Sequence, residues 1–145
     1  EKDAPYRTHY IIVPYLATLL GGLTTSILLP CASVYGFLVT GVGDAIGEPV
    51  GTRFGRHPYR VPSMRGVVCT RTLEGSAAVF LVSTAAAFVA ANVLNGGDSR
   101  IISLAGLVLV IGLASALCEA VSPHGWDNFT LQVVPAAIAY TFQSM

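Results

Sequence analysis

Charge is scarce in this chain of 145 residues. Only 11% of the residues are Asp, Glu, Lys or Arg, with eight acids against eight bases, whereas about 25% is usual in soluble domains. So low a charge excludes an ordinary cytosolic globule. The high apolar content excludes a disordered chain, which needs low hydrophobicity and high net charge. The chain also lacks a long basic stripe, so nucleic acid is not an expected partner.

Cysteine is scarce as well. The three cysteines, Cys31, Cys69 and Cys118, lie far apart in the sequence and form no Cys-x-x-Cys pair. An odd and scattered set predicts free thiols rather than a disulfide framework or a zinc site.

Apolar residues, by contrast, make up 53% of the chain. They gather in stretches of about 20 residues, the length with which an α-helix crosses a bilayer. Four stretches are clear, and a fifth is short and broken by a proline: 10–30, 31–51, 75–94, 101–121 and 129–145. Alanines at 85–87, 90 and 91 in the third stretch would let helix backbones approach closely. The sequence therefore predicts an all-α polytopic integral membrane helix bundle with four or five transmembrane helices, as a single domain over residues 1–145.

Basic residues are concentrated in one connection. Five of the eight lie between the second and third stretches, namely Arg53, Arg56, Arg60, Arg65 and Arg71. Because cytoplasmic loops carry an excess of Lys and Arg, this connection is predicted to face the cytoplasm. Counting spans outward from it brings five of the eight acids to the same face: Asp44, Glu48, Glu74, Glu119 and Asp127. Carboxylates at the ends of apolar stretches are costly to hold there, so an active site is predicted at this cytoplasmic face.

The segment 43–57, GDAIGEPVGTRFGRH, combines several of these features. Its glycines at 43, 47, 51 and 55 keep one side of a helix bare, so another helix or a phosphate-bearing ligand can approach closely. Arg53 and Arg56 follow, and guanidinium groups bind phosphate bidentately. A nearby carboxylate suits a bridging Mg²⁺, which takes one or two carboxylates plus substrate phosphates. The residues alone favour a membrane enzyme that handles a nucleoside triphosphate.

Two further blocks follow in order. TRTLEGS at 70–76 is similar to a Lys-Ser/Thr-x-Glu-Gly-Ser pattern, with Arg71 in place of the lysine, and EAVSPHGWDNFT at 119–130 is similar to Glu…Ser-Pro…Asp-Asn-x-Thr. Together the three blocks resemble the signature of the CTP-dependent polyprenol kinase family, which includes dolichol kinase, phytol and farnesol kinase and yeast-type diacylglycerol kinase. The resemblance implies transfer of the γ-phosphate of CTP to a lipid alcohol, with Mg²⁺ as cofactor. The expected partners are CTP, a polyprenol, phytol, farnesol or diacylglycerol, and the bilayer.

The resemblance also implies roles for individual residues. Asp44 and Asp127 would hold Mg²⁺ on the phosphates of CTP. Glu74, Glu119 or Asp127 would accept the proton of the lipid hydroxyl or hold a second metal ion. The residues expected to bind the nucleotide and its phosphates are Gly51, Arg53, Arg56, Arg71, Ser76 and Asn128.

Two other functions stay open. The first two blocks are also similar to those of phosphatidate cytidylyltransferase, which makes CDP-diacylglycerol from CTP, but segment 123–128 lacks the second glycine and the final arginine of that enzyme's signature, which favours a kinase. A non-catalytic membrane subunit or a small transporter is the alternative from another class. Transport is disfavoured because we find no internal repeat and the acids lie at one face.

Smaller expectations concern two single residues and the extent of the chain. His124 lies in a polar connection, which is typical of a surface group, and Trp126 is typical of an interfacial anchor. The family resemblance implies an upstream Arg-Lys element that the leader at 1–9 does not offer. The chain is therefore expected to be the C-terminal part of a longer enzyme or a divergent member, with an oligomer left open.

Overall fold

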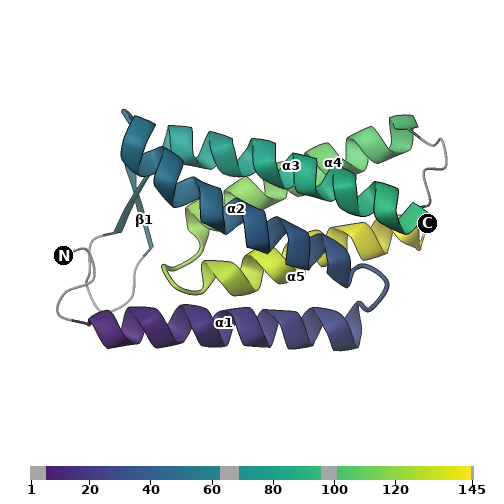
Figure 1. Cartoon of the computed structure of the whole chain (residues 1–145), viewed down its shortest axis with the longest axis horizontal. Coiled ribbons are helices and arrows are strands. Elements are labelled where there is room, and N and C mark those ends of the chain that lie inside the picture. Colours follow the sequence, from purple (N-terminus) through teal and green to yellow (C-terminus); the bar gives the residue numbers. More distant parts are fainter. Residues whose placement is uncertain (1–5, 63–68, 96–100, 145) are drawn as a thin grey trace.

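Five helices and one β-hairpin make up the described part of the chain (Figure 1). The computed structural model describes residues 6–62, 69–95 and 101–144. The helices are α1 (Arg7–Leu28), α2 (Ser33–Phe54), α3 (Leu73–Asn95), α4 (Ile101–Val121) and α5 (Asp127–Gln143). Strands β1 (Pro58–Val61) and β2 (Cys69–Thr72) pair antiparallel between α2 and α3. The predicted all-α bundle is confirmed, and the hairpin is an addition to it that was not predicted.

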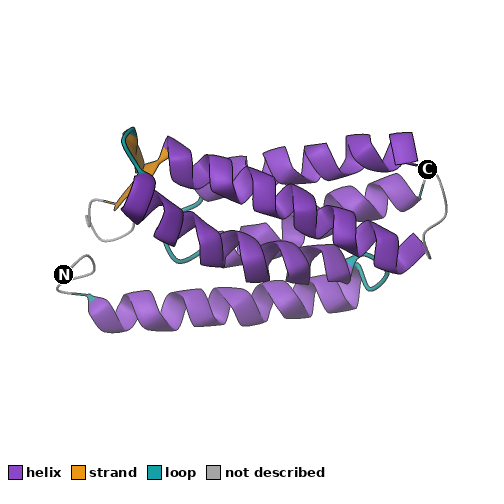
Figure 2. Cartoon of the chain, turned by 45° about the horizontal axis from the view of Figure 1, so that its top comes forward, coloured by secondary structure: helices purple, strands orange, loops and turns teal. Residues whose placement is uncertain are grey.

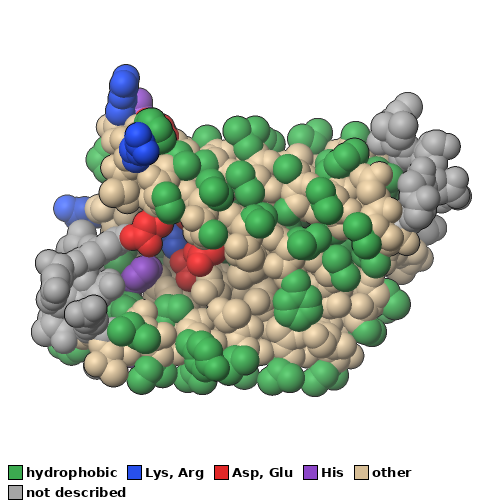
Figure 3. All heavy atoms as spheres, viewed as in Figure 1, with side chains coloured by type: hydrophobic (Ala, Val, Ile, Leu, Met, Phe, Trp, Pro, Cys, Tyr) green, Lys and Arg blue, Asp and Glu red, His purple; other side chains and the backbone are tan. Residues whose placement is uncertain are grey.

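Three of the helices are long and apolar enough to cross a membrane. Among the described residues these segments are Thr8–Leu28, Leu73–Leu94 and Leu104–Val121. The exterior of the bundle is apolar as well, since Ile27, Leu81 and Leu117 are each more than half exposed. Figure 3 shows such side chains along the length of one face. An apolar surface of this extent fits contact with lipid tails rather than water.

The helices lie side by side, and the chain reverses its direction at each connection (Figures 1 and 2). As a result α2 and α4 end, and α3 and α5 begin, at the end of the bundle that carries β1 and β2, which we call the hairpin end. Helix α5 packs against α1, α2 and α4. This arrangement confirms that the acidic ends of the helices meet at one end of the bundle.

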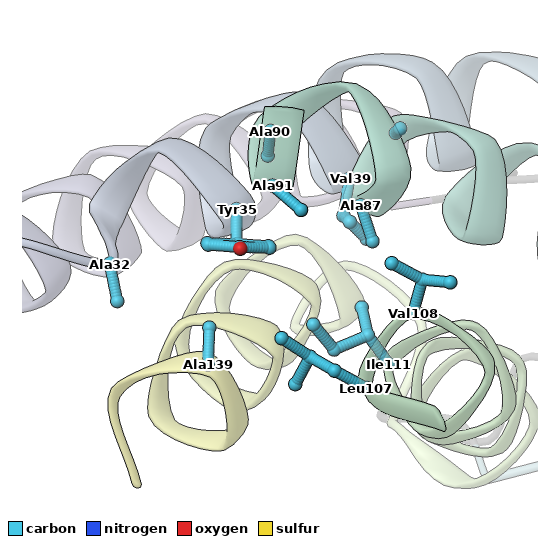
Figure 4. Packing of buried hydrophobic residues seen from close by; sticks show 11 residues of the cluster. Ala32, Tyr35, Val39, Ala87, Ala90, Ala91, Leu107, Val108, Ile111 and Ala139 are labelled. Atoms are coloured by element: carbon cyan, nitrogen blue, oxygen red, sulfur yellow. The ribbon is translucent and has the colours of Figure 1, made fainter. Parts of the chain in front are cut away.

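Small side chains allow this close packing (Figure 4). Ala87, Ala90 and Ala91 of α3 are fully buried together with Val39 of α2 and Ile111 of α4. The alanines of the third apolar stretch thus let neighbouring helices approach closely, as predicted, except at position 85, which is exposed. Without a hydrophobic driving force in lipid, helices associate largely through such close van der Waals contact.

Candidate functional site

A cavity of about 400 Å³ lies at the hairpin end. Four carboxylates line it, two from α2, one from α4 and one from α5, together with a single arginine from β2: Asp44, Glu48, Glu119, Asp127 and Arg71. Figure 3 shows acidic side chains gathered around a basic one at this end, beside a histidine. With the histidine neutral, the lining has a formal excess of three negative charges. An anion that binds there would therefore be favoured by accompanying cations.

Arg71 connects the walls of the cavity. Its guanidinium donates to the backbone carbonyl of Glu119 and to Oδ2 of Asp127, and its Nη1 lies 3.3 Å from Oε1 of Glu119. The Arg71 side chain is only 15% exposed, and the two carboxylate side chains are each 9% exposed. One largely buried cation therefore holds β2, α4 and α5 together, and hydrogen bonds in which a partner is charged are the strong ones.

The hairpin brings Arg71 to this position. In its register Arg71 lies opposite Tyr59, and the Tyr59 hydroxyl is 2.6 Å from Oγ of Ser76 on α3. Helix α3 begins directly after β2, where the N–H of Gly75 donates to Oγ1 of Thr72 at 3.1 Å. This is an N-cap, which satisfies one of the free donors of the first turn. The strand and the helix are thus joined without a loop.

The two oxygens of Asp127 are both engaged. Oδ2 accepts from Arg71, and Oδ1 accepts from the backbone N–H of Asn128 at 3.1 Å. The side-chain amide of Asn128 donates to Oγ1 of Thr18 on α1 at 3.1 Å. Asn128, expected to bind the nucleotide, is not among the residues that line the cavity, and the bond it makes ties α5 to α1.

The glycines of α2 face α3 and the end of β2. A Cβ at Gly47 would lie 2.8 Å from Cγ2 of Val79 on α3, and one at Gly51 would lie 2.9 Å from Oγ1 of Thr72 on β2. The bare backbone was expected to allow the close approach of another helix or of a phosphate-bearing ligand, and the approach of a helix is confirmed. Gly47 and Gly51 line the cavity as well, so they also leave room in its wall.

Glu74, expected in the site, lies outside the cavity lining. Its Oε1 is 2.7 Å from Nδ1 of His57, and its Oε2 accepts the backbone N–H of His57 at 3.3 Å. The His57 side chain is 70% exposed. This pair joins the start of α3 to the segment that precedes β1.

The other predicted arginines lie on the outside of the hairpin end. Arg53, Arg56 and Arg60 are exposed, and the Arg53 guanidinium lies 5.5 Å from the centre of the Phe54 ring. None of the three lines the cavity. Arg65 falls outside the described residues. The basic connection of the sequence therefore divides into one buried arginine and a set of exposed ones.

Glu48 and His124 line the cavity, although neither had an individual role in the site assigned from the sequence. Glu48 was expected at this face, and it lies four residues after Asp44 on the same face of α2. His124, predicted as a surface group, is half-buried in the cavity wall, with its ring 5.0 Å from that of Tyr10. The backbone N–H of His124 donates to the carbonyl of Pro62 at 3.3 Å, so the α4–α5 turn is attached to the hairpin.

The lining is suited to Mg²⁺. Among the described residues, no group of three His, Cys, Asp or Glu side chains could hold a metal ion. Mg²⁺, however, binds through one or two carboxylates and completes its shell with water and phosphate oxygens. The acidic lining supplies such oxygens, and Oε2 of Glu119 is buried without a hydrogen-bond partner in the described structure.

The comparisons with known proteins give one relative. No protein-family profile and no solved structure matches the chain. Phytol kinase from Synechocystis sp. is 33% identical over 125 residues, which make up 86% of this chain and 50% of that enzyme. The chain thus spans about half the length of the curated relative it matches.

Proposed function

The chain belongs to the polyprenol and phytol kinase family, and from this premise we propose that it is a membrane lipid kinase acting at the cytoplasmic face. In the proposed reaction, the hydroxyl oxygen of a lipid alcohol attacks the γ-phosphorus of CTP. The bond to the β–γ bridging oxygen breaks, and CDP leaves. The hydroxyl proton passes to a carboxylate of the cavity, Glu119 or Asp127. Phosphoryl transfer depends mainly on positioning and on electrostatic stabilisation.

The acidic cavity at the hairpin end is the observation that carries this proposal. A lining with three excess negative charges repels a triphosphate unless a cation lies between them. Asp44, with Asp127 as the predicted second ligand, would hold Mg²⁺ against the phosphates. When bound, Mg²⁺ supplies the positive charge that offsets the phosphates and the charge developing on the transferred group. The bare backbone at Gly51 and the hydroxyl of Ser76 leave space and a hydrogen-bonding group in the same wall.

The exposed arginines have a place in this scheme. Arg53 and Arg56 lie at the same end of the bundle as the cavity but outside its lining. Positive charge near an entrance raises the local concentration of an anionic substrate. We assign these residues to the capture of the triphosphate as it approaches from the aqueous side.

Phytol is the first acceptor to test, since the name of the Synechocystis enzyme indicates this alcohol for that protein. The apolar exterior of the bundle would keep the isoprenoid tail in the bilayer while the hydroxyl reaches the hairpin end. Farnesol, longer polyprenols and diacylglycerol are the other acceptors of the same chemical class.

The test uses the purified chain in lipid nanodiscs with Mg²⁺ and CTP labelled at either the α or the γ phosphate. We expect γ label in lipid phosphate with the wild type and none with Asp44→Asn. Ser33→Ala, at the opposite end of α2, is the matched control and should transfer at the wild-type rate. Transfer of α label to phosphatidate would show a cytidylyltransferase and overturn the proposal, as would the absence of any label in lipid.

A further inference from the structure

The two buried carboxylates of the cavity differ in how they are engaged. Both oxygens of Asp127 have hydrogen-bond partners, Arg71 on one side and the N–H of Asn128 on the other. In Glu119 only Oε1 lies near Arg71, at 3.3 Å, and Oε2 is buried without a partner in the described part of the chain. Glu119 is only 7% exposed, so solvent hydrates that oxygen poorly.

A buried carboxylate oxygen without a partner is costly, because the group has lost its hydration without compensation. Native structures resolve such cases with a water, an ion or a ligand. Glu119 is one of the residues that line the cavity, and a cation bound there would supply the partner that this oxygen lacks. The unpartnered oxygen is thus an observation separate from the mere clustering of acids.

Glu119 also lies close to the turn of α2 that carries Asp44, a second carboxylate of the cavity. Its Oε1 is 2.9 Å from the position that a Cβ at Gly47 would occupy. Gly47 is three residues after Asp44, and residues three apart share a face of a helix. The absence of a side chain at Gly47 therefore allows the α4 carboxylate to lie against the turn of α2 that presents Asp44 to the cavity.

We infer that Asp44 and Glu119 are the protein ligands of the divalent cation, and that Arg71 holds Asp127 out of that role. The inference deepens the proposed function and depends on it for the identity of the cation. It replaces the expected pair of Asp44 and Asp127. Two carboxylates with water and phosphate oxygens form the coordination shell that Mg²⁺ prefers.

Mn²⁺ binding to the purified chain without nucleotide tests the inference, because Mn²⁺ in water gives an electron paramagnetic resonance signal that bound Mn²⁺ loses. Asp44→Asn and Glu119→Gln should each weaken binding at least as much as the loss of an outer-shell partner does, about tenfold. Asp127→Asn should weaken it less than either. Ser33→Ala, at the opposite end of α2, is the control and should bind as the wild type does.

Glu119→Asp is the second variant in case Glu119→Gln does not fold, since it keeps the charge beside Arg71 but withdraws the carboxylate from the cavity. It too should weaken Mn²⁺ binding. An effect of Asp127→Asn as large as that of Asp44→Asn, or a wild-type affinity in both Glu119 variants, would overturn the inference. So would a wild type that binds no Mn²⁺.

The inference and the proposed function can fail separately. Phosphoryl transfer by a wild type whose Mn²⁺ affinity is insensitive to Glu119 would leave the kinase standing and remove this ligand. Mn²⁺ binding that depends on Asp44 and Glu119, without label transfer to any lipid, would support the cation site and remove the kinase.

Discussion

Removing the guanidinium of Arg71 should destabilise the bundle strongly. In Arg71→Met the apolar part of the side chain is retained, but Glu119 and Asp127 lose their shared countercharge, and the carbonyl of Glu119 loses its donor. Both carboxylate side chains are only 9% exposed. Breaking a buried ion pair by removing one partner costs about 3–5 kcal/mol. Because Arg71 retains 15% exposure, we expect the lower end, about 3 kcal/mol.

The single tryptophan of the chain gives the assay. Trp126 immediately precedes α5 and is partly exposed, so its fluorescence reports on the region next to Asp127. Unfolding by sodium dodecyl sulfate in mixed micelles would be followed for the wild type, Arg71→Met, Asp127→Asn and the double variant. The double variant should be more stable than the sum of the single changes predicts, with a coupling free energy of about 1–3 kcal/mol.

Arg71→Lys separates charge from geometry. Lysine keeps the positive charge but is a point donor without the planar fork that lets arginine bind two partners at once. Its stability should therefore lie between that of the wild type and that of Arg71→Met. A loss below about 0.5 kcal/mol in Arg71→Met, the range of ordinary surface substitutions, would refute the role of Arg71 as the link between β2, α4 and α5.

Three other outcomes are expected. Gly47→Ala should destabilise the bundle by about 1–3 kcal/mol through overpacking and lower phosphoryl transfer, because the new Cβ would lie 2.9 Å from Oε1 of Glu119. Gly41→Ala, where a Cβ meets nothing within 4 Å, is the control. Equal stability of the two variants in thermal unfolding would contradict overpacking at Gly47. Removal of divalent cations with EDTA should abolish phosphoryl transfer and Mg²⁺ should restore it, whereas continued transfer in EDTA would exclude the cation site. His57→Ala should leave both the unfolding midpoint and the transfer rate unchanged, because exposed ion pairs contribute little; a loss of transfer would place His57 and its partner Glu74 in the reaction.

The bundle could be predicted because its signals are local. Apolar stretches show where helices lie in the sequence, and the reversal of direction at each connection then decides which helix ends meet. For this reason Asp44, Glu119 and Asp127 could be brought together by counting spans alone, although Glu119 lies 75 positions after Asp44 in the sequence. The chemistry expected at their meeting point follows from residue types, which the sequence also shows.

The hairpin and the pairing inside the cavity could not be predicted in the same way. Strands β1 and β2 have four residues each, too few for a clear alternation of apolar and polar residues. The partners of Arg71 come from α4 and α5, more than 45 residues further along the chain. No local pattern distinguishes an arginine shared by two carboxylates from one that is free to bind phosphate, and the same limit applies to Glu119 and its unpartnered oxygen.

The direct junction between Thr72 of β2 and Leu73 of α3 has a mechanical consequence. A transmembrane helix that is longer than the local hydrocarbon layer adapts by tilting, and α3 cannot tilt without moving the strand attached to it. Arg71 lies in this strand, two residues before the start of α3. A movement of the strand would therefore be passed to Glu119 and Asp127, which Arg71 contacts. The thickness of the surrounding bilayer would in this way act on the geometry of the cavity.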